Sequence, residues 1–375
     1  MFKILRFILA VFYISILHAD DYYKGDTLVR EGVHAFYNYE FDKAVNILSE
    51  ARIQFPDHPG VHLIWAASRW VRSQAHSPVG ETYRILKKDL DEIGPVYDEL
   101  VDKYEYDPNY KLYQGSALGL SARVALGKKQ WLRTLIRSYR GFIIIKDVAK
   151  GSPEITDAQL PIGIVEYFAG LSNPIISWAV RLYDLDASTE SGLHRMALAA
   201  DEGHWSWIEA KAILSNLYLW VENDPILALE HAKDLVRYFP DNYYFNLLYL
   251  ESLIRTNKID ISKVIIRNMK ISSSKLTDRQ IKWYSPYLDY EIALLSFHQE
   301  DYLKALELVS QTIDDYTAEL DIILGNAYLL QGMCYDRLDQ RVKAKDSYNK
   351  CIALDNFSGS IKRAKEYLRQ PFSGI

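Results

Sequence analysis

Apolar residues recur every three or four positions along most of the chain, which is the period of an amphipathic helix. Between residues 25 and 55 the pattern divides into two such helices, and from 205 to 370 it continues as one helix after another. No stretch shows the convincing alternation of apolar and polar residues that is typical of a strand. The pattern therefore predicts an all-α protein.

Five residues in the first helix pair stand at a characteristic spacing: Gly32, Ala44, Leu48, Ala51 and Pro56. A glycine inside a helix costs about 1 kcal/mol relative to alanine, so it usually marks close packing. We expect Gly32 where the two helices cross, Ala44 and Ala51 on the facing side, and Leu48 as the larger plug between them. Pro56 is expected to end the second helix.

The same offsets return later in the chain, at Ala228 and Pro240, at Ala305, and at Gly332 and Ala344. These residues resemble the tetratricopeptide repeat (TPR), a unit of about 34 residues built from two antiparallel helices. One such pair cannot bury its apolar face alone, so repeats stack on one another. The resemblance implies an α-solenoid of TPR-like antiparallel helix pairs.

The central part of the chain departs from this pattern. Residues 81–104 and 128–149 predict helices longer than a standard TPR helix, and we expect Asp107-Pro108 to end the first of them. The apolar stretch 159–183 is interrupted by polar residues and indicates two short buried helices. We therefore expect one continuous solenoid with N-terminal TPR-like repeats, an atypical helical section and C-terminal TPR-like repeats. The limits of these three sections are 20–110, 111–205 and 206–375.

A second resemblance covers residues 111–258. The residues that carry it are Gly192, Leu193, Ala197, Ala200, Gly203, Glu209, Ala210, Leu214 and Pro240-Asp241-Asn242. This block is similar to the central block of a group of exported bacterial TPR proteins, and more loosely to part of the eukaryotic inclusion-body-clearance family. The likeness implies a helical-repeat protein and no catalytic residues.

The first nineteen residues have the features of a secretory signal. Lys3 and Arg6 precede an apolar run, 7–17, and Ala19 is a plausible cleavage site. We expect export to the periplasm or cell envelope, or secretion where the host has no outer membrane. An uncleaved membrane anchor is the alternative.

The charge balance bears on partners. The chain has 44 Lys and Arg against 49 Asp and Glu, a net charge of −5. This balance argues against general nucleic-acid binding.

Two cysteines, Cys334 and Cys351, fall on the two helices of the last repeat. Export would permit a disulfide between them. A buried free thiol at Cys351 would pack equally well against the facing helix. The sequence leaves both states open.

Signatures of catalysis are missing from the chain. It contains no phosphate-binding loop, dinucleotide fingerprint, HExxH or paired CxxC motif. His194, Glu202 and His204 are close in sequence, but they are better explained as a solvated helix end than as a metal site. The acidic residues of 89–92 indicate an exposed helix face. We expect no enzyme activity, no cofactor and no metal.

A basic stripe is predicted on the helix 128–149. Lys129, Arg133, Arg137 and Arg140 recur at helical spacing, opposite apolar residues. Such a face could meet anionic lipid or an acidic partner. A merely solvated face is the alternative.

An aromatic-rich concave wall is the other candidate site. Transferring the register of TPR first helices to this chain places a set of large side chains on the inner surface of the solenoid. The set consists of Phe36, Tyr37, Trp220, Tyr244, Tyr287, Tyr290, Phe297 and Arg337. These residues could pack between neighbouring repeats or line a groove for a ligand.

Together these features predict an exported, non-enzymatic scaffold that binds a peptide or protein segment in the concave face of a TPR solenoid. A membrane-associated helical protein is the first alternative, with peripheral contact through the basic helix 128–149 and the apolar segment 160–183. A helical carbohydrate-active enzyme is a third hypothesis, suggested by the content of 28 Tyr and 8 Trp.

Overall fold

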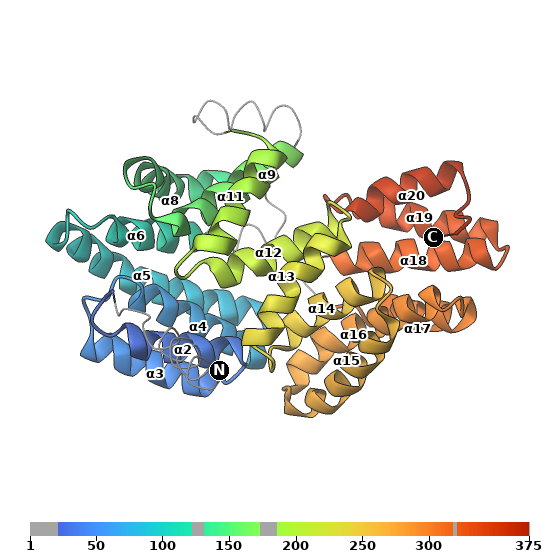
Figure 1. The fold of residues 1–375 in the computed structure, drawn as a ribbon, viewed down its shortest axis with the longest axis horizontal. Coiled ribbons are helices and arrows are strands. Elements are labelled where there is room, and N and C mark those ends of the chain that lie inside the picture. Colours follow the sequence, from blue (N-terminus) through green and yellow to red (C-terminus); the bar gives the residue numbers. More distant parts are fainter. Residues whose placement is uncertain (1–21, 122–130, 173–185, 318–320, 375) are drawn as a thin grey trace, which may run out of the picture.

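The computed structural model describes residues 22–121, 131–172, 186–317 and 321–374, with side chains of α8 from Tyr139 onward (Figure 1). Every regular element in these ranges is a helix, which confirms the all-α prediction. The α-helices are α2 (Asp26–Tyr37), α3 (Phe41–Gln54), α4 (Val61–His76), α5 (Val79–Lys103), α6 (Pro108–Leu120), α8 (Trp131–Gly151), α9 (Gln159–Leu171), α11 (Thr189–Glu202), α12 (Trp207–Trp220), α13 (Pro225–Tyr238), α14 (Tyr243–Arg255), α15 (Ile259–Ser272), α16 (Asp278–His298), α17 (Tyr302–Asp315), α18 (Ile322–Arg337), α19 (Arg341–Ala353) and α20 (Gly359–Arg369). Two short 3₁₀ helices are η1 (Thr156–Ala158) and η2 (Ser273–Lys275).

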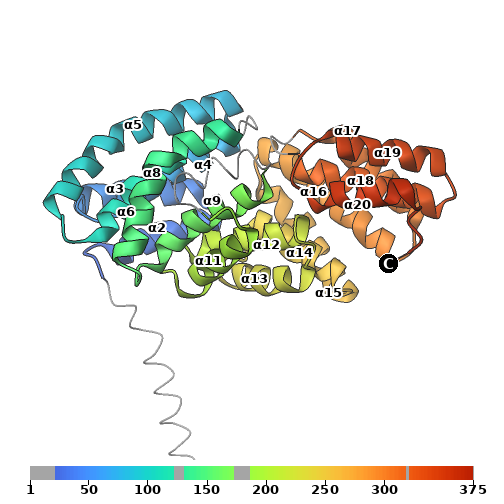
Figure 2. The ribbon, with the colours of Figure 1, turned by 90° about the horizontal axis from the view of Figure 1, so that it is seen from above.

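Consecutive helices pack as pairs, and the pairs stack into a solenoid (Figures 1 and 2). Within the described ranges the pairs are α2/α3, α4/α5, α6/α8, α9/α11, α12/α13, α14/α15, α16/α17 and α18/α19, which we number repeats 1 to 8. The first helices of successive repeats also touch, α12 with α14, α14 with α16 and α16 with α18. Helix α20 packs on α18 and α19, closing the last repeat.

The first repeat shows why a glycine is needed at the crossing. A Cβ on Gly32 would lie 2.6 Å from Cγ of Leu48, so α2 approaches α3 too closely for any side chain at this position. Leu48, Ala44 and Ala51 are fully buried. Helix α3 ends at Gln54, just before the exposed Pro56.

The later repeats use the same device. At Gly332 in repeat 8 an added Cβ would lie 2.3 Å from the ring of Tyr348. Ala228, Ala305 and Ala344 are fully buried on the second helices of repeats 5, 7 and 8. Helix α13 ends at Tyr238, before the exposed Pro240.

Turns between the two helices of a repeat share an unusual backbone. Tyr39, Asn223, Asn257, Glu300 and Asp339 all have φ between 57° and 64°. They follow α2, α12, α14, α16 and α18, the first helices of repeats 1, 5, 6, 7 and 8. Asn and Asp tolerate this left-handed conformation better than other side chains, whereas Tyr39 and Glu300 are strained by it. The repeated geometry marks equivalent positions that the sequence alone does not align.

The central section consists of helix pairs held by facing glycines. In repeat 3 an added Cβ on Gly115 would lie 2.8 Å from the carbonyl oxygen of Gly141, and one on Gly141 would lie 2.3 Å from that of Gly115. Gly163 and Gly192 face each other in the same way in repeat 4, at 2.7 and 2.6 Å. The backbones themselves therefore touch, which is a closer approach than the glycine-to-side-chain crossing of repeat 1.

One boundary expected in this section was wrong. Asp107-Pro108 does not end α5, which stops at Lys103, but begins α6. The Asp107 side chain accepts a hydrogen bond from the Asn109 amide, and Pro108 occupies the first turn, where its missing N–H costs nothing. Of the two buried helices expected in 159–183, α9 is present, and residues 173–183 lie outside the described residues.

Candidate functional site

The solenoid curls so that its first repeat contacts repeats 5, 6 and 7. At the end of α2, the Tyr37 hydroxyl donates to Glu209 on α12 at 2.5 Å, and the Tyr37 carbonyl accepts from the Asn242 side chain at 2.8 Å. Two residues later, the Tyr39 hydroxyl forms a hydrogen bond of 2.8 Å with the Tyr284 hydroxyl on α16. We call this set of five residues the closure contact. Figure 1 shows α2 and α4 beside the middle helices.

Side chains of the closure contact are held from both sides. The side-chain oxygen of Asn242 accepts a hydrogen bond from the Phe245 amide and so caps α14. Its side-chain nitrogen donates to the Tyr37 carbonyl in the last turn of α2. Tyr37 packs its ring on Phe239 and Phe245, with centroids 5.1 and 5.9 Å apart. Burial raises the pKa of Tyr37 well above its ordinary value, so its hydroxyl remains a hydrogen-bond donor.

A second connection joins repeats 2 and 7. The Thr277 hydroxyl donates to the Ala75 carbonyl at 2.6 Å, and Nε of Arg279 donates to the Gln74 carbonyl at 3.0 Å. These carbonyls belong to the last turn of α4, where no intrahelical donor is available and a positive charge is favourable. The start of α16 is thereby fixed to the end of α4.

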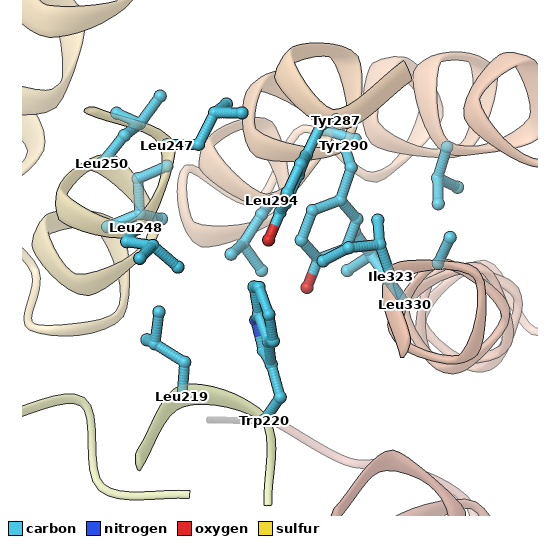
Figure 3. Close-up of a cluster of buried hydrophobic side chains, with 14 of the residues drawn as sticks. Leu219, Trp220, Leu247, Leu248, Leu250, Tyr287, Tyr290, Leu294, Ile323 and Leu330 are labelled. Atoms are coloured by element: carbon cyan, nitrogen blue, oxygen red, sulfur yellow. The ribbon is translucent and has the colours of Figure 1, made fainter. Parts of the chain in front are cut away.

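The aromatic residues expected on the concave wall lie largely inside this packing. Phe36 is half-buried and packs edge-on against Tyr37, at 4.8 Å. Tyr244 donates its hydroxyl to Asn216 at 2.6 Å, and its ring lies 6.4 Å from Tyr287. Figure 3 shows Tyr287 and Tyr290 on α16 directed toward Trp220 at the end of α12. Contacts between repeats account for these side chains, and their role in binding stays a prediction.

Beneath these rings lies a pair of buried glutamates. Nε1 of Trp220 donates to Glu251 at 2.8 Å, and Arg255 reaches the same carboxyl at 3.3 Å. The Glu291 carboxyl faces Glu251, and no described residue donates to either of its oxygens. Burial, and then the proximity of Glu251, raises the pKa of Glu291 well above its ordinary value. The Glu291 carboxyl therefore stays protonated to a higher pH than an exposed glutamate does.

The last two expected residues, Phe297 and Arg337, contact a later segment of the chain. Phe372 packs between Phe297 and Tyr367, with ring centroids 5.7 and 5.3 Å away. Its backbone N–H donates to Asp336 at 2.9 Å. The following carbonyl, that of Ser373, accepts from Arg337 at 2.5 Å. Residues 371–374, which are outside any helix, therefore occupy this end of the expected groove.

Comparison with known proteins bears on the fold. No family model and no curated protein matches the chain. Among solved structures, the APC/C hetero-tetramer Cut9–Hcn1 is similar to this chain, with 11% sequence identity and a TM-score of 0.52. The match covers 96% of this chain and 58% of the matched chain. This chain thus spans under two thirds of that one.

The chain folds as a TPR solenoid.

Two further matches have lower TM-scores. A tetratricopeptide repeat protein from Parabacteroides merdae is 12% identical, covering 92% of this chain and 97% of its own at a TM-score of 0.32. Yeast Tom70 is also 12% identical, covering 98% and 85% at a TM-score of 0.38. At these identities the likeness concerns the fold alone, so the site must be argued from the solenoid's own residues.

The expected basic stripe is only partly described. Lys129 lies outside the described residues, and Arg133 and Arg137 lie on α8 in the part whose side chains are not described. Arg140 is exposed on the same helix. No helix among the described residues is long and apolar enough to cross a membrane.

A buried titratable pair links the two helices of repeat 1. His58 and Asp26 form a buried pair at 2.7 Å, which ties the turn after α3 to the start of α2. Within the described ranges no three His, Cys, Asp or Glu residues are placed to hold a metal ion. Cys334 and Cys351 are free and buried, so the disulfide alternative is not realised.

One member of the acidic cluster in 89–92 was wrongly expected on the surface. Of the acidic residues in 89–92, Asp89 is buried, and Arg69 on α4 donates to it at 2.8 Å. Asp89 faces α4 because α5 packs along that helix, while Asp91 and Glu92 remain exposed. Asp89 stands three positions after Leu86 and four before Ile93, and both of these are buried. Helical spacing therefore places Asp89 on the same face of α5 as these two residues.

Proposed function

We propose that the chain is a non-catalytic scaffold that binds an extended peptide or protein segment at the C-terminal end of the solenoid. The site is formed by Phe297, Tyr302, Asp336, Arg337 and Tyr367, which we call the turn-edge seat. The observation that supports it is the segment 371–374, which lies outside any helix and bonds to this site through its backbone and the Phe372 ring.

Backbone groups of this segment are recognised on both sides. Asp336 accepts a hydrogen bond from the N–H of Phe372, and Arg337 donates one to the carbonyl of Ser373. Any extended peptide can supply these two backbone groups. Asp336 is held in place by two hydrogen bonds from Arg341 and one from the Tyr348 hydroxyl. Arg337 lies over the ring of Tyr302, 5.0 Å from its centroid. The seat is thus ordered by its own neighbours, which lowers the entropic cost of binding.

Side-chain preference follows from the rings around Phe372. Its side chain is buried between Phe297 and Tyr367, so an aromatic residue at the equivalent position of a partner would fill the same place. Aromatic anchors in desolvated pockets commonly contribute 2 kcal/mol or more. We therefore expect a partner with an exposed aromatic residue in an extended segment.

A labelled peptide with the sequence of residues 368–374 tests this proposal. Phe372→Ala empties the aromatic position, and this variant should bind the peptide about tenfold more tightly than the parent, whose own segment competes. Adding Arg337→Glu should abolish binding, whereas adding Lys362→Glu on exposed α20 should not. Circular dichroism melts establish that each variant is folded. Absence of binding to folded Phe372→Ala, or binding unaffected by Arg337→Glu, would refute the proposal.

We also propose that the chain is exported. The basic start, apolar run and Ala19 support this, and they lie outside the described residues. N-terminal sequencing of the native protein should find a start near Asp20, and an intact Met1 would support the anchor alternative.

A further inference from the structure

Helix α15 carries an exposed aliphatic stripe. Its buried side is formed by Ser262 and Met269, which face the rest of repeat 6. On other sides of the helix Ile261, Val264 and Ile271 are 47%, 49% and 68% exposed. With 3.6 residues per turn, Val264 and Ile271 are about 20° apart around the helix and Ile261 is within about 80° of both. Three large aliphatic side chains therefore form one outward stripe.

Cations border this stripe on one side. Lys263, Arg267 and Lys270 are exposed; Lys270 has Asp289 on α16 as an acidic neighbour, and Lys263 and Arg267 form no ion pair with a described residue. Elsewhere exposed lysines on second helices do pair, as Lys43 does with Glu40 and Lys350 with Asp346. Residues 258–275 contain a single acidic residue, Asp260, although the whole chain is net negative. The segment is therefore a local cationic patch on an acidic protein.

We propose that this face of α15 docks on the surface of an anionic lipid bilayer. An apolar stripe bordered by Lys and Arg is the pattern of a helix that lies in a membrane interface, with the aliphatic groups in the acyl boundary and the cations at the headgroups. Helix α15 lies at the margin of the molecule in both views, so a flat surface can approach it (Figures 1 and 2).

The bilayer is favoured over an acidic protein by the shape of this face. The aliphatic side chains project from the outer side of a second helix instead of lining a hollow between helices. A fluid bilayer accommodates such a convex surface, whereas a peptide anchor needs a pocket. The inference is independent of the turn-edge seat, which lies on repeats 7 and 8 and α20.

Vesicle co-sedimentation tests the inference. The protein should sediment with phosphatidylcholine vesicles that contain phosphatidylserine, but not with pure phosphatidylcholine, and less so at high salt. Val264→Asp with Ile271→Asp should weaken the partition about tenfold or more, while Val342→Asp, at an even more exposed aliphatic site on α19, should not. Arg140→Glu on α8 should also leave it unchanged, which separates α15 from the basic stripe.

Charge must act locally for the inference to hold. Reversal of Lys263, Arg267 and Lys270 to Glu should abolish sedimentation. Reversal of Lys345, Lys362 and Lys365, which changes net charge equally, should largely preserve it. No sedimentation at low salt, or equal losses from both triple variants, would overturn the inference. Binding to polyglutamate that depends on the three cations but not on the aliphatic stripe would also overturn it, in favour of an acidic protein.

Discussion

Gly192→Ala is the sharpest test of the packing described for the central section. In repeat 4, Gly192 on α11 faces Gly163 on α9. An added Cβ would lie 2.6 Å from three atoms: the Gly163 carbonyl oxygen, and Cβ and the backbone nitrogen of Tyr167. Two of these belong to the backbone, so no side-chain rotation relieves the contact.

The expected loss follows from these distances. Ordinary contact begins at 3.4 Å, so α9 and α11 must separate by about 0.8 Å over a well-packed seam. Overpacking of this kind destabilises a protein by about 1–3 kcal/mol. Replacing a helical glycine by alanine stabilises it by about 0.4–1 kcal/mol, because the unfolded chain loses conformational freedom. We expect a net destabilisation of about 1–2 kcal/mol.

Gly80 supplies the matched control. It is an exposed glycine near the start of α5, and an added Cβ there would have no atom within 4 Å. Gly80→Ala should therefore stabilise the protein by about 0.4–1 kcal/mol, the opposite sign to Gly192→Ala. Urea unfolding followed by circular dichroism measures both. If the two substitutions shift stability in the same direction, the assignment of a backbone contact at Gly192 is wrong.

Three further predictions concern buried and strained groups. Because the pKa of Glu291 is raised, the folded protein holds a proton that the unfolded chain has lost above about pH 4.5, so stability falls as pH rises. Glu291→Gln should remove the part of this loss of stability that Glu291 causes, so at pH 8 the variant should melt at a higher temperature than the parent. Glu230→Gln, at an exposed glutamate, should leave the pH dependence of the melts unchanged. Glu300→Gly should relieve the left-handed turn after α16 and raise the free energy of unfolding by about 0.5–1 kcal/mol, and an unchanged midpoint would contradict the strain. Burial raises the pKa of Cys334 to about 12 and of Cys351 to about 11, so neither should react with a thiol reagent at neutral pH until the protein is denatured.

Local spacing predicted those features that depend on neighbours in the chain. The crossing at Gly32 and the buried Leu48 lie sixteen residues apart in one helix pair, so their relation could be inferred from offsets. The contact between Gly163 and Gly192 could not be inferred in this way. The two glycines are on helices whose relative register depends on tertiary packing. Periodicity identifies the helices, while the crossing point is set by the fit of their surfaces.

The candidate site was limited by the same distinction. Register placed Trp220 and Tyr287 on first helices, where the structure finds them, but it could not show what packs on them. The partners of Tyr37 lie more than 170 residues away in sequence, and no local pattern encodes a contact at that separation. Likewise, nothing near Arg337 in the sequence indicates that Ser373 would accept its hydrogen bond.

The closure contact changes how this solenoid should come apart. In an open repeat array each unit touches only its neighbours, and either end can fray one repeat at a time. Here the first repeat also contacts repeats 5, 6 and 7, so it cannot open without breaking contacts to the middle of the array. The C-terminal end is tied to the middle as well, because Arg363 on α20 donates to Asn223 at 3.4 Å and the ring of Phe357 lies 6.5 Å from that of Phe168. Neither end should therefore fray one repeat at a time, and hydrogen exchange in α2 and in α20 should be slower than at the ends of an open array.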